Sequence, residues 1–175
     1  QERVTRLIVL FLLLQLSCSL VWGSEDVVKL ADLDASVVTP NSWQLKENFL
    51  GMHYTLFAPK SGNDRRAVIA ISKIERSLGP LGSNKKDQLE QIKQNVVSSK
   101  HNWLKKRKAG LISIRTIPQG VETVYRLGAV EFLEISNYHF CSKGLIHLKL
   151  LQTAKIGATS EAAIEVVRSF KCETP

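Results

Sequence analysis

Three residues near the end of the chain have side chains that could do chemistry: His139, Cys141 and His147. They flank the segment Ser142–Gly144, which is typical of a short hairpin loop with glycine at a position of positive φ. A three-residue loop predicts that Cys141 faces Leu145 and that His139 faces His147. Two imidazoles at cross-strand distance can bind zinc or copper, and a thiolate would improve the site. A thiol beside an imidazole also suggests nucleophilic catalysis.

A second cysteine, Cys172, favours a different interpretation of Cys141. Without residues 1–23 the chain keeps only these two cysteines, and an even count in an oxidising compartment favours a disulfide. The bond would close a loop of about 30 residues and stabilise the protein by about 3–4 kcal/mol in the chain-entropy model. An oxidised Cys141 cannot ligate a metal as thiolate, and His139 and His147 alone are an incomplete ligand set.

The sequence has no GxSxG, HExxH, P-loop or GxGxxG motif. We therefore predict a structural disulfide, no catalytic residue and no metal or other cofactor. The alternative is a small metal-binding protein or thiol enzyme centred on Cys141, His139 and His147. The thiol state of the two cysteines separates these hypotheses, because an oxidised pair would silence the thiol chemistry.

The N-terminal segment is typical of an export signal. Two arginines precede the apolar run Leu7–Leu14, and Val21 and Gly23 occupy the −3 and −1 positions of a cleavage site before Ser24. The alternative is a membrane anchor that the mature protein retains, but the apolar segment is short for a membrane span, which favours cleavage. Acylation of Cys18, as in a bacterial lipoprotein, is a third possibility, although the residues before it depart from that pattern. The prediction is an exported protein, periplasmic or secreted.

The formal net charge is +8, and its strongest local feature is the run Lys105, Lys106, Arg107 and Lys108. One hypothesis is contact with acidic lipid headgroups or an acidic partner, with Trp103 as an interfacial anchor. The other is a solvated helix end, where cations are favoured by the helix dipole and the tryptophan packs on the sheet. Adjacent charges spread around a helix, which favours the second hypothesis.

The sequence thus divides into a signal peptide (1–23), an irregular or extended N-terminal arm (24–42) and one α+β domain (43–175), in which hydrophobic periodicity predicts the helices and strands. In the long helix, Asn84 is the expected N-cap and Gly110 the expected stop signal. The expected elements are strands within Trp43–Phe49, Met52–Pro59, Ala67–Ile74, Leu111–Ile117, Val121–Ser136, Tyr138–Cys141 and Leu145–Thr153, the helix Asn84–Gly110, and a final helix from Thr159 or Ser160.

The hairpin between the last strands predicts a mostly antiparallel sheet. Both of its faces carry apolar groups, so one helix should cover each face. Under the three-residue loop, one face holds Tyr138, Phe140, Ile146 and Leu148, and the other holds Cys141 and Leu145. Glu131 and Glu134 are expected on opposite faces as solvent-facing charges.

The chain contains, in order, SWQLKENF–MHYTLFAP, AVIAISK, the long helix, VYRLGAVEFLEISNYHF, GLIHLKLLQTA and SEAAIEVVRSFKC. Over Trp43–Cys172 this order resembles the PsbP-like superfamily, which includes the Ran-binding nuclear import factors and the DcrB-like bacterial envelope proteins. The ending Val167–Phe170 is similar to the end of DcrB-like domains. Members of the superfamily are mostly non-catalytic. The resemblance implies the fold and argues against an enzyme. Together with the export signal, it leads us to predict an exported binding or assembly module of the cell envelope. We expect its partner to be an envelope protein, an anionic lipid surface or a small hydrophobic ligand, and not nucleic acid.

Overall fold

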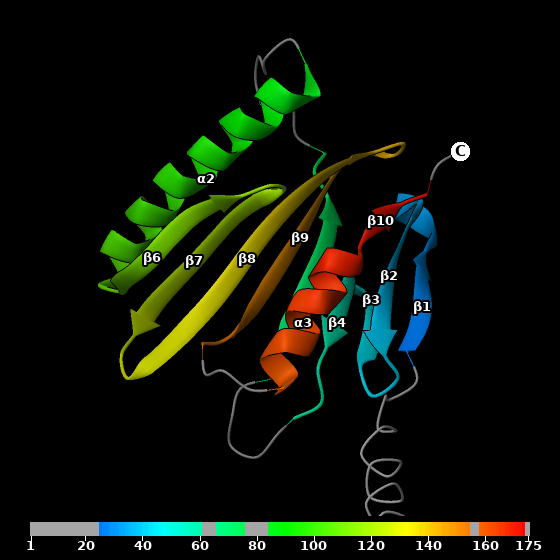
Figure 1. Cartoon of the computed structure of the whole chain (residues 1–175), viewed down its shortest axis with the longest axis horizontal. Coiled ribbons are helices and arrows are strands. Elements are labelled where there is room, and N and C mark those ends of the chain that lie inside the picture. Colours follow the sequence, from blue (N-terminus) through cyan, green and yellow to red (C-terminus); the bar gives the residue numbers. More distant parts are fainter. Residues whose placement is uncertain (1–24, 61–65, 76–83, 155–157, 174–175) are drawn as a thin grey trace, which may run out of the picture.

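Figure 1 shows the computed structural model of the chain, which describes residues 25–60, 66–75, 84–154 and 158–173. The predicted leader, its cleavage site, Cys18 and most of the turn expected at 61–66 lie outside the described residues. The elements are β1 (Glu25–Leu30), the 3-10 helix η1 (Ala31–Leu33), β2 (Ala35–Pro40), β3 (Gln44–Phe49), β4 (Met52–Phe57), β5 (Val68–Lys73), α2 (Lys85–Arg107), β6 (Gly110–Ile117), β7 (Gly120–Leu127), β8 (Val130–Cys141), β9 (Gly144–Thr153), α3 (Ala158–Ser169) and β10 (Lys171–Cys172).

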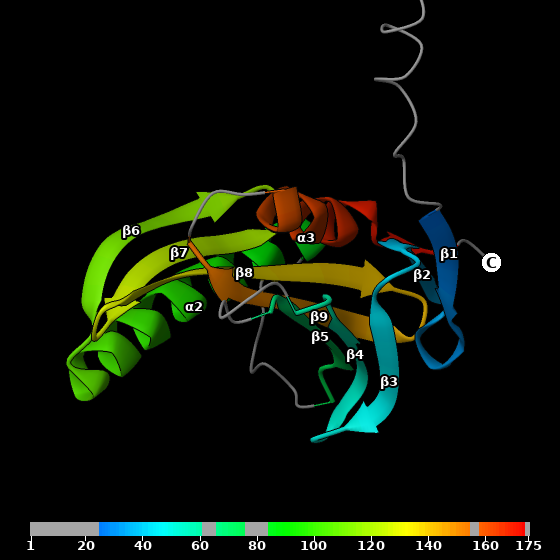
Figure 2. The same ribbon diagram turned by 90° about the horizontal axis from the view of Figure 1, so that it is seen from below.

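The main sheet has seven strands in the order β3-β4-β5-β9-β8-β7-β6, and every neighbouring pair is antiparallel. Helix α2 lies on one face of this sheet, at the β6–β7 end, and α3 lies on the opposite face (Figure 2). The predicted α+β class is confirmed, with a mostly antiparallel sheet between a long central helix and a C-terminal helix.

The N-terminal residues are extended, which is one of the two forms expected of the arm, but they pair into a sheet and contribute to the core. Strands β1 and β2 form an antiparallel hairpin, which β10 completes as a three-stranded sheet. Leu30, Leu33 and Val37 are fully buried in the main hydrophobic core. Burial alternates along β2, whose sequence ASVVTP contains three consecutive β-branched residues, a composition typical of strands.

Helix α2 begins as predicted, because the Asn84 side chain accepts a hydrogen bond from the Asp87 backbone N–H at 2.9 Å. Its end differs from the prediction. Lys108, at φ 53°, adopts the left-handed conformation, and its N–H donates to the carbonyl groups of Leu104 and Lys105. These bonds satisfy carbonyl groups at the helix end without a glycine at that position. Gly110 is instead the first residue of β6.

The hairpin between β8 and β9 has a two-residue loop, not the expected three-residue loop. Cys141 pairs with Gly144, whose φ is 124°. Strand β8 is also continuous across Ser136 and Tyr138, where the sequence suggested a break. Because side chains alternate along a strand, the shift of one residue moves all the β9 side chains to the other face relative to β8. Tyr138 and Phe140 therefore lie on one face of the sheet, whereas Ile146 and Leu148 lie on the other face. Cys141 and Leu145, which were expected to share a face, are likewise on different faces.

The main hydrophobic core lies on the α3 side of the sheet. Its centre is formed by buried side chains of β5, β9 and α3: Ile69, Ile71, Ile146, Leu148, Leu150, Ala163, Val166 and Val167. On the α2 side a smaller cluster joins Leu104 to Tyr125 and Phe132. This cluster fixes the C-terminal half of α2 on β7 and β8, and a pocket lies between the helix and the sheet beside it.

Candidate binding pocket between helix α2 and the sheet

The structure does not bring the two candidate metal ligands together. Tyr138 pairs with His147, and His139 pairs with Ile146, so the histidines lie on opposite faces of the sheet. The His139 ring lies 4.7 Å from the ring of Phe170, on the α3 side. The His147 ring stacks on Tyr138, with centroids 4.6 Å apart and planes 4° apart, on the α2 side. The expected cross-strand pair of imidazoles is therefore wrong.

The two cysteines are close enough for the predicted disulfide. The Cα atoms of Cys141 and Cys172 lie 5.3 Å apart, and their sulfur atoms are bonded. The bond connects the end of β8 to β10. In the described part of the chain, no group of three or more histidine, cysteine, aspartate or glutamate side chains is placed to hold a metal ion.

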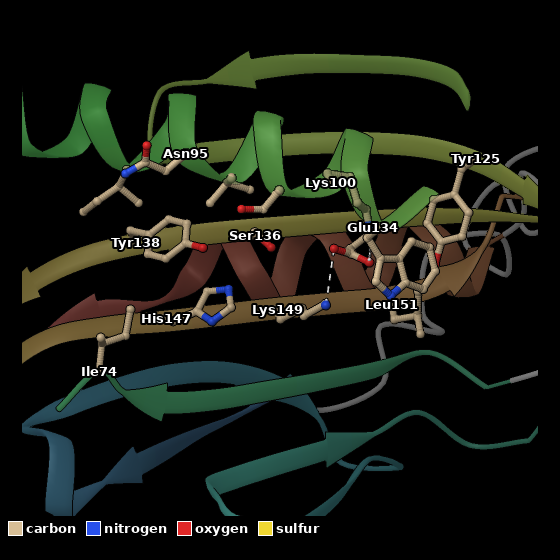
Figure 3. A pocket seen from close by; sticks show the side chains of 14 residues that line it. Ile74, Asn95, Lys100, Tyr125, Glu134, Ser136, Tyr138, His147, Lys149 and Leu151 are labelled. Atoms are coloured by element: carbon tan, nitrogen blue, oxygen red, sulfur yellow. Dashed lines mark hydrogen bonds and ion pairs between the residues drawn. The ribbon is translucent and has the colours of Figure 1, made fainter. Parts of the chain in front are cut away.

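A cavity of about 510 Å³ lies between α2 and strands β7, β8 and β9 (Figure 3). Its apolar walls come from both the helix and the sheet, and Trp103 and Leu151, each 36 % exposed, lie at its edge. The full lining is Ile74, Ile92, Asn95, Val96, Ser99, Lys100, Trp103, Tyr125, Glu134, Ser136, Tyr138, His147, Lys149 and Leu151.

Three charged side chains meet in this pocket. The Glu134 carboxylate accepts a hydrogen bond from Lys100 Nζ at 2.6 Å, and its other oxygen lies 3.3 Å from Lys149 Nζ. The side chains of Lys100 and Glu134 are only 9 % and 11 % exposed. Burial lowers the pKa of Lys100, against the opposing effect of the bond to Glu134. Glu134 was expected to face solvent, and this expectation is wrong because Lys100 of α2 covers it.

Glu131 behaves as the sequence predicted. It lies on the opposite face of β8 from Glu134 and pairs with the exposed Arg126.

Glu134 is the functional candidate that the sequence analysis missed, although the sequence of α2 contains a signal for a buried carboxylate partner. Lys100 falls on the same helical stripe as Ile92 and Val96, and a lysine on an apolar stripe implies a carboxylate partner on the surface that the stripe covers.

The aromatic rings of the pocket are held in their neutral forms. Burial raises the pKa of Tyr138 to about 12, and the same cause raises the pKa of Tyr125 to about 12, with the Glu134 charge contributing to both. Burial lowers the pKa of His147 to about 4, and the neighbouring charge of Lys149 adds to this effect. His147 is therefore a neutral imidazole at pH 7. Its Nε2 atom is buried and makes no hydrogen bond to the described residues.

The depressed pKa of His147 predicts an acid-labile protein. Between pH 6.5 and about 4 the unfolded chain binds a proton at His147 that the folded chain does not, so the free energy of unfolding falls as the pH drops through this window. Above pH 6.5 this contribution to the pH dependence vanishes. His147→Phe keeps a ring against Tyr138 and removes the titration. The variant should gain about 2 kcal/mol relative to the original protein between pH 7.5 and pH 4.5.

Urea unfolding at a series of pH values measures this difference. Glu134, Lys149 and Lys100 face the same pocket and His139 lies on the other sheet face, but all four are present in both proteins and their direct contributions cancel. Parallel stability curves for the two proteins would contradict the prediction.

The basic run at the end of α2 is on the surface. Lys105, Lys106, Arg107 and Lys108 are all exposed. Trp103 packs edge-on against Tyr125, with centroids 5.5 Å apart, and the Arg107 guanidinium lies 5.9 Å from its ring. The tryptophan thus contacts the sheet and also lines the pocket. Contact of the run with an anionic partner stays a prediction.

None of the described helices has a stretch long and apolar enough to cross a bilayer. No protein-family model matches the sequence, and no curated protein matches it. The structure, however, is similar to solved structures. The cyanobacterial PsbP of Synechocystis sp. PCC 6803 aligns at a TM-score of 0.51 and 16 % identity, covering 88 % of this chain and 95 % of that one.

The Ran-binding protein Mog1p of Saccharomyces cerevisiae aligns at a TM-score of 0.49 and 10 % identity, covering 86 % of this chain and 96 % of that one. These alignments do not show closeness to the DcrB-like proteins, which stays a prediction. The likeness to PsbP concerns the fold alone. The chain has the α+β architecture of the PsbP-like fold.

Proposed function

We propose that this protein is an exported, non-catalytic binding module of the cell envelope, and that it holds a small ligand in the pocket between α2 and the sheet. The pocket itself carries this proposal. Its volume of about 510 Å³ falls within the roughly 300–1,000 Å³ typical of small-molecule sites. It combines apolar walls with a few convergent polar groups, which is the usual composition of such sites.

The arrangement of the reactive side chains supports a binding role over catalysis. A thiol nucleophile needs a free thiolate and a nearby base. Cys141 is bonded to Cys172, and His147 lies on the other face of the sheet. The metal-binding or thiol-enzyme alternative depended on Cys141, His139 and His147 acting together. Among the described residues no hydrogen bond joins Cys141 to either histidine, and the Nε2 atoms of both histidines have no hydrogen-bond partner.

The pocket can be tested with probes of different charge. We would record amide chemical shifts of the isotope-labelled protein while adding 1-octanol, octanoate or octyltrimethylammonium. At least one probe is expected to shift amides around Val96, Ser99, Tyr138 and His147. Ser99→Phe, which places a ring at the exposed helical wall of the pocket, should suppress the shifts and leave the fold intact. If all three probes fail to shift these amides, the pocket is not the binding site.

The bonded cysteines support export, because disulfides persist in oxidising compartments and are rare in the cytosol. We expect the protein recovered from the periplasmic or secreted fraction to resist alkylation by iodoacetamide in denaturant. After reduction, Cys141 and Cys172 should both be alkylated. Quantitative alkylation of both residues without reductant would contradict the disulfide and reopen the thiol hypothesis.

A further inference from the structure

The pocket has an unequal number of positive and negative charges. Lys100 and Lys149 both approach Glu134, so two formal positive charges meet one negative charge. Among the residues that the structure describes, no other aspartate, glutamate, lysine or arginine lines the cavity. In a partly desolvated site a surplus charge interacts more strongly with a ligand than it would in water. The pocket therefore favours a ligand with one negative charge.

The two lysines differ in how they hold Glu134. Lys100 is nearly buried and makes the short bond of 2.6 Å, so it is committed to the carboxylate. Lys149 lies 3.3 Å from the other carboxylate oxygen and keeps 43 % of its side chain exposed. Its ammonium can turn from Glu134 towards an anion at the mouth of the pocket and leave Glu134 paired with Lys100. Lys149 is thus the cation available to a ligand.

His147 supplies a second polar group beside that cation. It lies two residues before Lys149 on β9 and points to the same face of the sheet (Figure 3). Its buried Nε2 atom has no hydrogen-bond partner among the described residues. A neutral imidazole in the appropriate tautomer would donate from Nε2 to a carboxylate oxygen, which would satisfy a buried atom that is otherwise unpaired.

The remaining walls suit an apolar body. Ile92 and Val96 of α2, Leu151 of β9 and Trp103 line the same cavity as the charged group. We infer that the pocket binds an amphipathic monoanion, such as a medium-chain fatty acid, with its carboxylate at Lys149 and its apolar chain between α2 and the sheet. This inference rests on the proposed function, since it assigns the ligand class of the same pocket.

Isothermal titration of the purified protein with eight-carbon ligands tests the inference. Octanoate should bind at least about tenfold more tightly than octyltrimethylammonium, and also more tightly than 1-octanol, because only octanoate complements the surplus charge. Lys149→Gln should weaken octanoate binding about tenfold and leave 1-octanol binding unchanged. Lys149→Arg, which keeps the charge, should restore octanoate binding. Lys106→Gln is the matched control, because it removes the same charge from the exposed end of α2 and should have no effect.

The inference is overturned if the octyl cation or 1-octanol binds as well as octanoate, or if Lys106→Gln weakens octanoate binding as much as Lys149→Gln. The first result would leave a pocket that binds without selecting an anion. The second would show that general basic charge attracts the ligand. Failure of all three ligands to bind would instead contradict the proposed function, so the two failures are distinguishable.

Discussion

Glu134→Gln is expected to destabilise the protein by about 3 kcal/mol, because it leaves the ammonium of Lys100 buried without an anion. Glutamine has nearly the shape of glutamate, so the loss measures charge and not packing. Lys149 cannot compensate, since it is also positive and lies on the same face. Urea unfolding at pH 7, with the midpoint and the slope both fitted, gives the free energy of unfolding.

The control is a double-mutant cycle with Lys100→Met. Methionine retains an unbranched apolar side chain beneath Trp103 and Tyr125 and removes the charge that needs a partner. The double variant should therefore recover much of the stability lost in Glu134→Gln. Strictly additive effects of the two substitutions would show that the pair does not act as a unit, and would contradict the structure.

Gly120→Ala is expected to have an effect at least as large. A Cβ atom on Gly120 would lie 1.7 Å from the carbonyl oxygen of Ser136 and 2.9 Å from Cα of Asn137, both on the neighbouring strand. Both obstacles are backbone atoms of the central sheet, so no change of rotamer relieves them. Strands β7 and β8 would have to separate locally, which costs about 3 kcal/mol or more. The thermal midpoint should fall by about 10 °C in consequence.

Gly110→Ala is the matched control. The nearest heavy atom to its new Cβ would be Cβ of Arg126 at 4.0 Å, which is ordinary contact distance, and the residue has no positive φ. Differential scanning calorimetry should place this variant within about 2 °C of the original protein. Equal midpoints for Gly120→Ala and Gly110→Ala would show that β7 is not held against β8 as the structure places it.

The sequence predicted the parts of the fold that depend on local signals. The side chain of Asn84 marks the start of α2, and the alternating strands from Trp43 onward were recognisable by their period. The N-terminal hairpin was missed because its strands are short and depend on pairing with β10, which lies more than a hundred residues later. Hydrophobic periodicity does not report a pairing between the two ends of a chain.

The site was harder to predict because it depends on one register and one long-range pair. The segment Ser142–Gly144 fits a two-residue or a three-residue loop, and only the paired strands decide between them. That difference of one residue separates His139 from His147 and places His147 beside Tyr138. Glu134 and Lys100 are 34 positions apart, and their contact follows from the placement of α2 on the sheet.

The pairing of β10 with β2 affects how fast the protein folds and when folding can be completed. The backbone N–H of Val38 donates to the hydroxyl of Ser169, 131 positions later, and Lys171 pairs with Ser36. Contacts of such sequence separation slow folding, because a long loop must close before they form. A nascent chain cannot complete its small sheet until the last helix and strand have been synthesised. Removing residues 171–173 eliminates β10 together with Cys172 and its disulfide, and should therefore accelerate hydrogen exchange in β2, which lies more than a hundred residues earlier in the sequence.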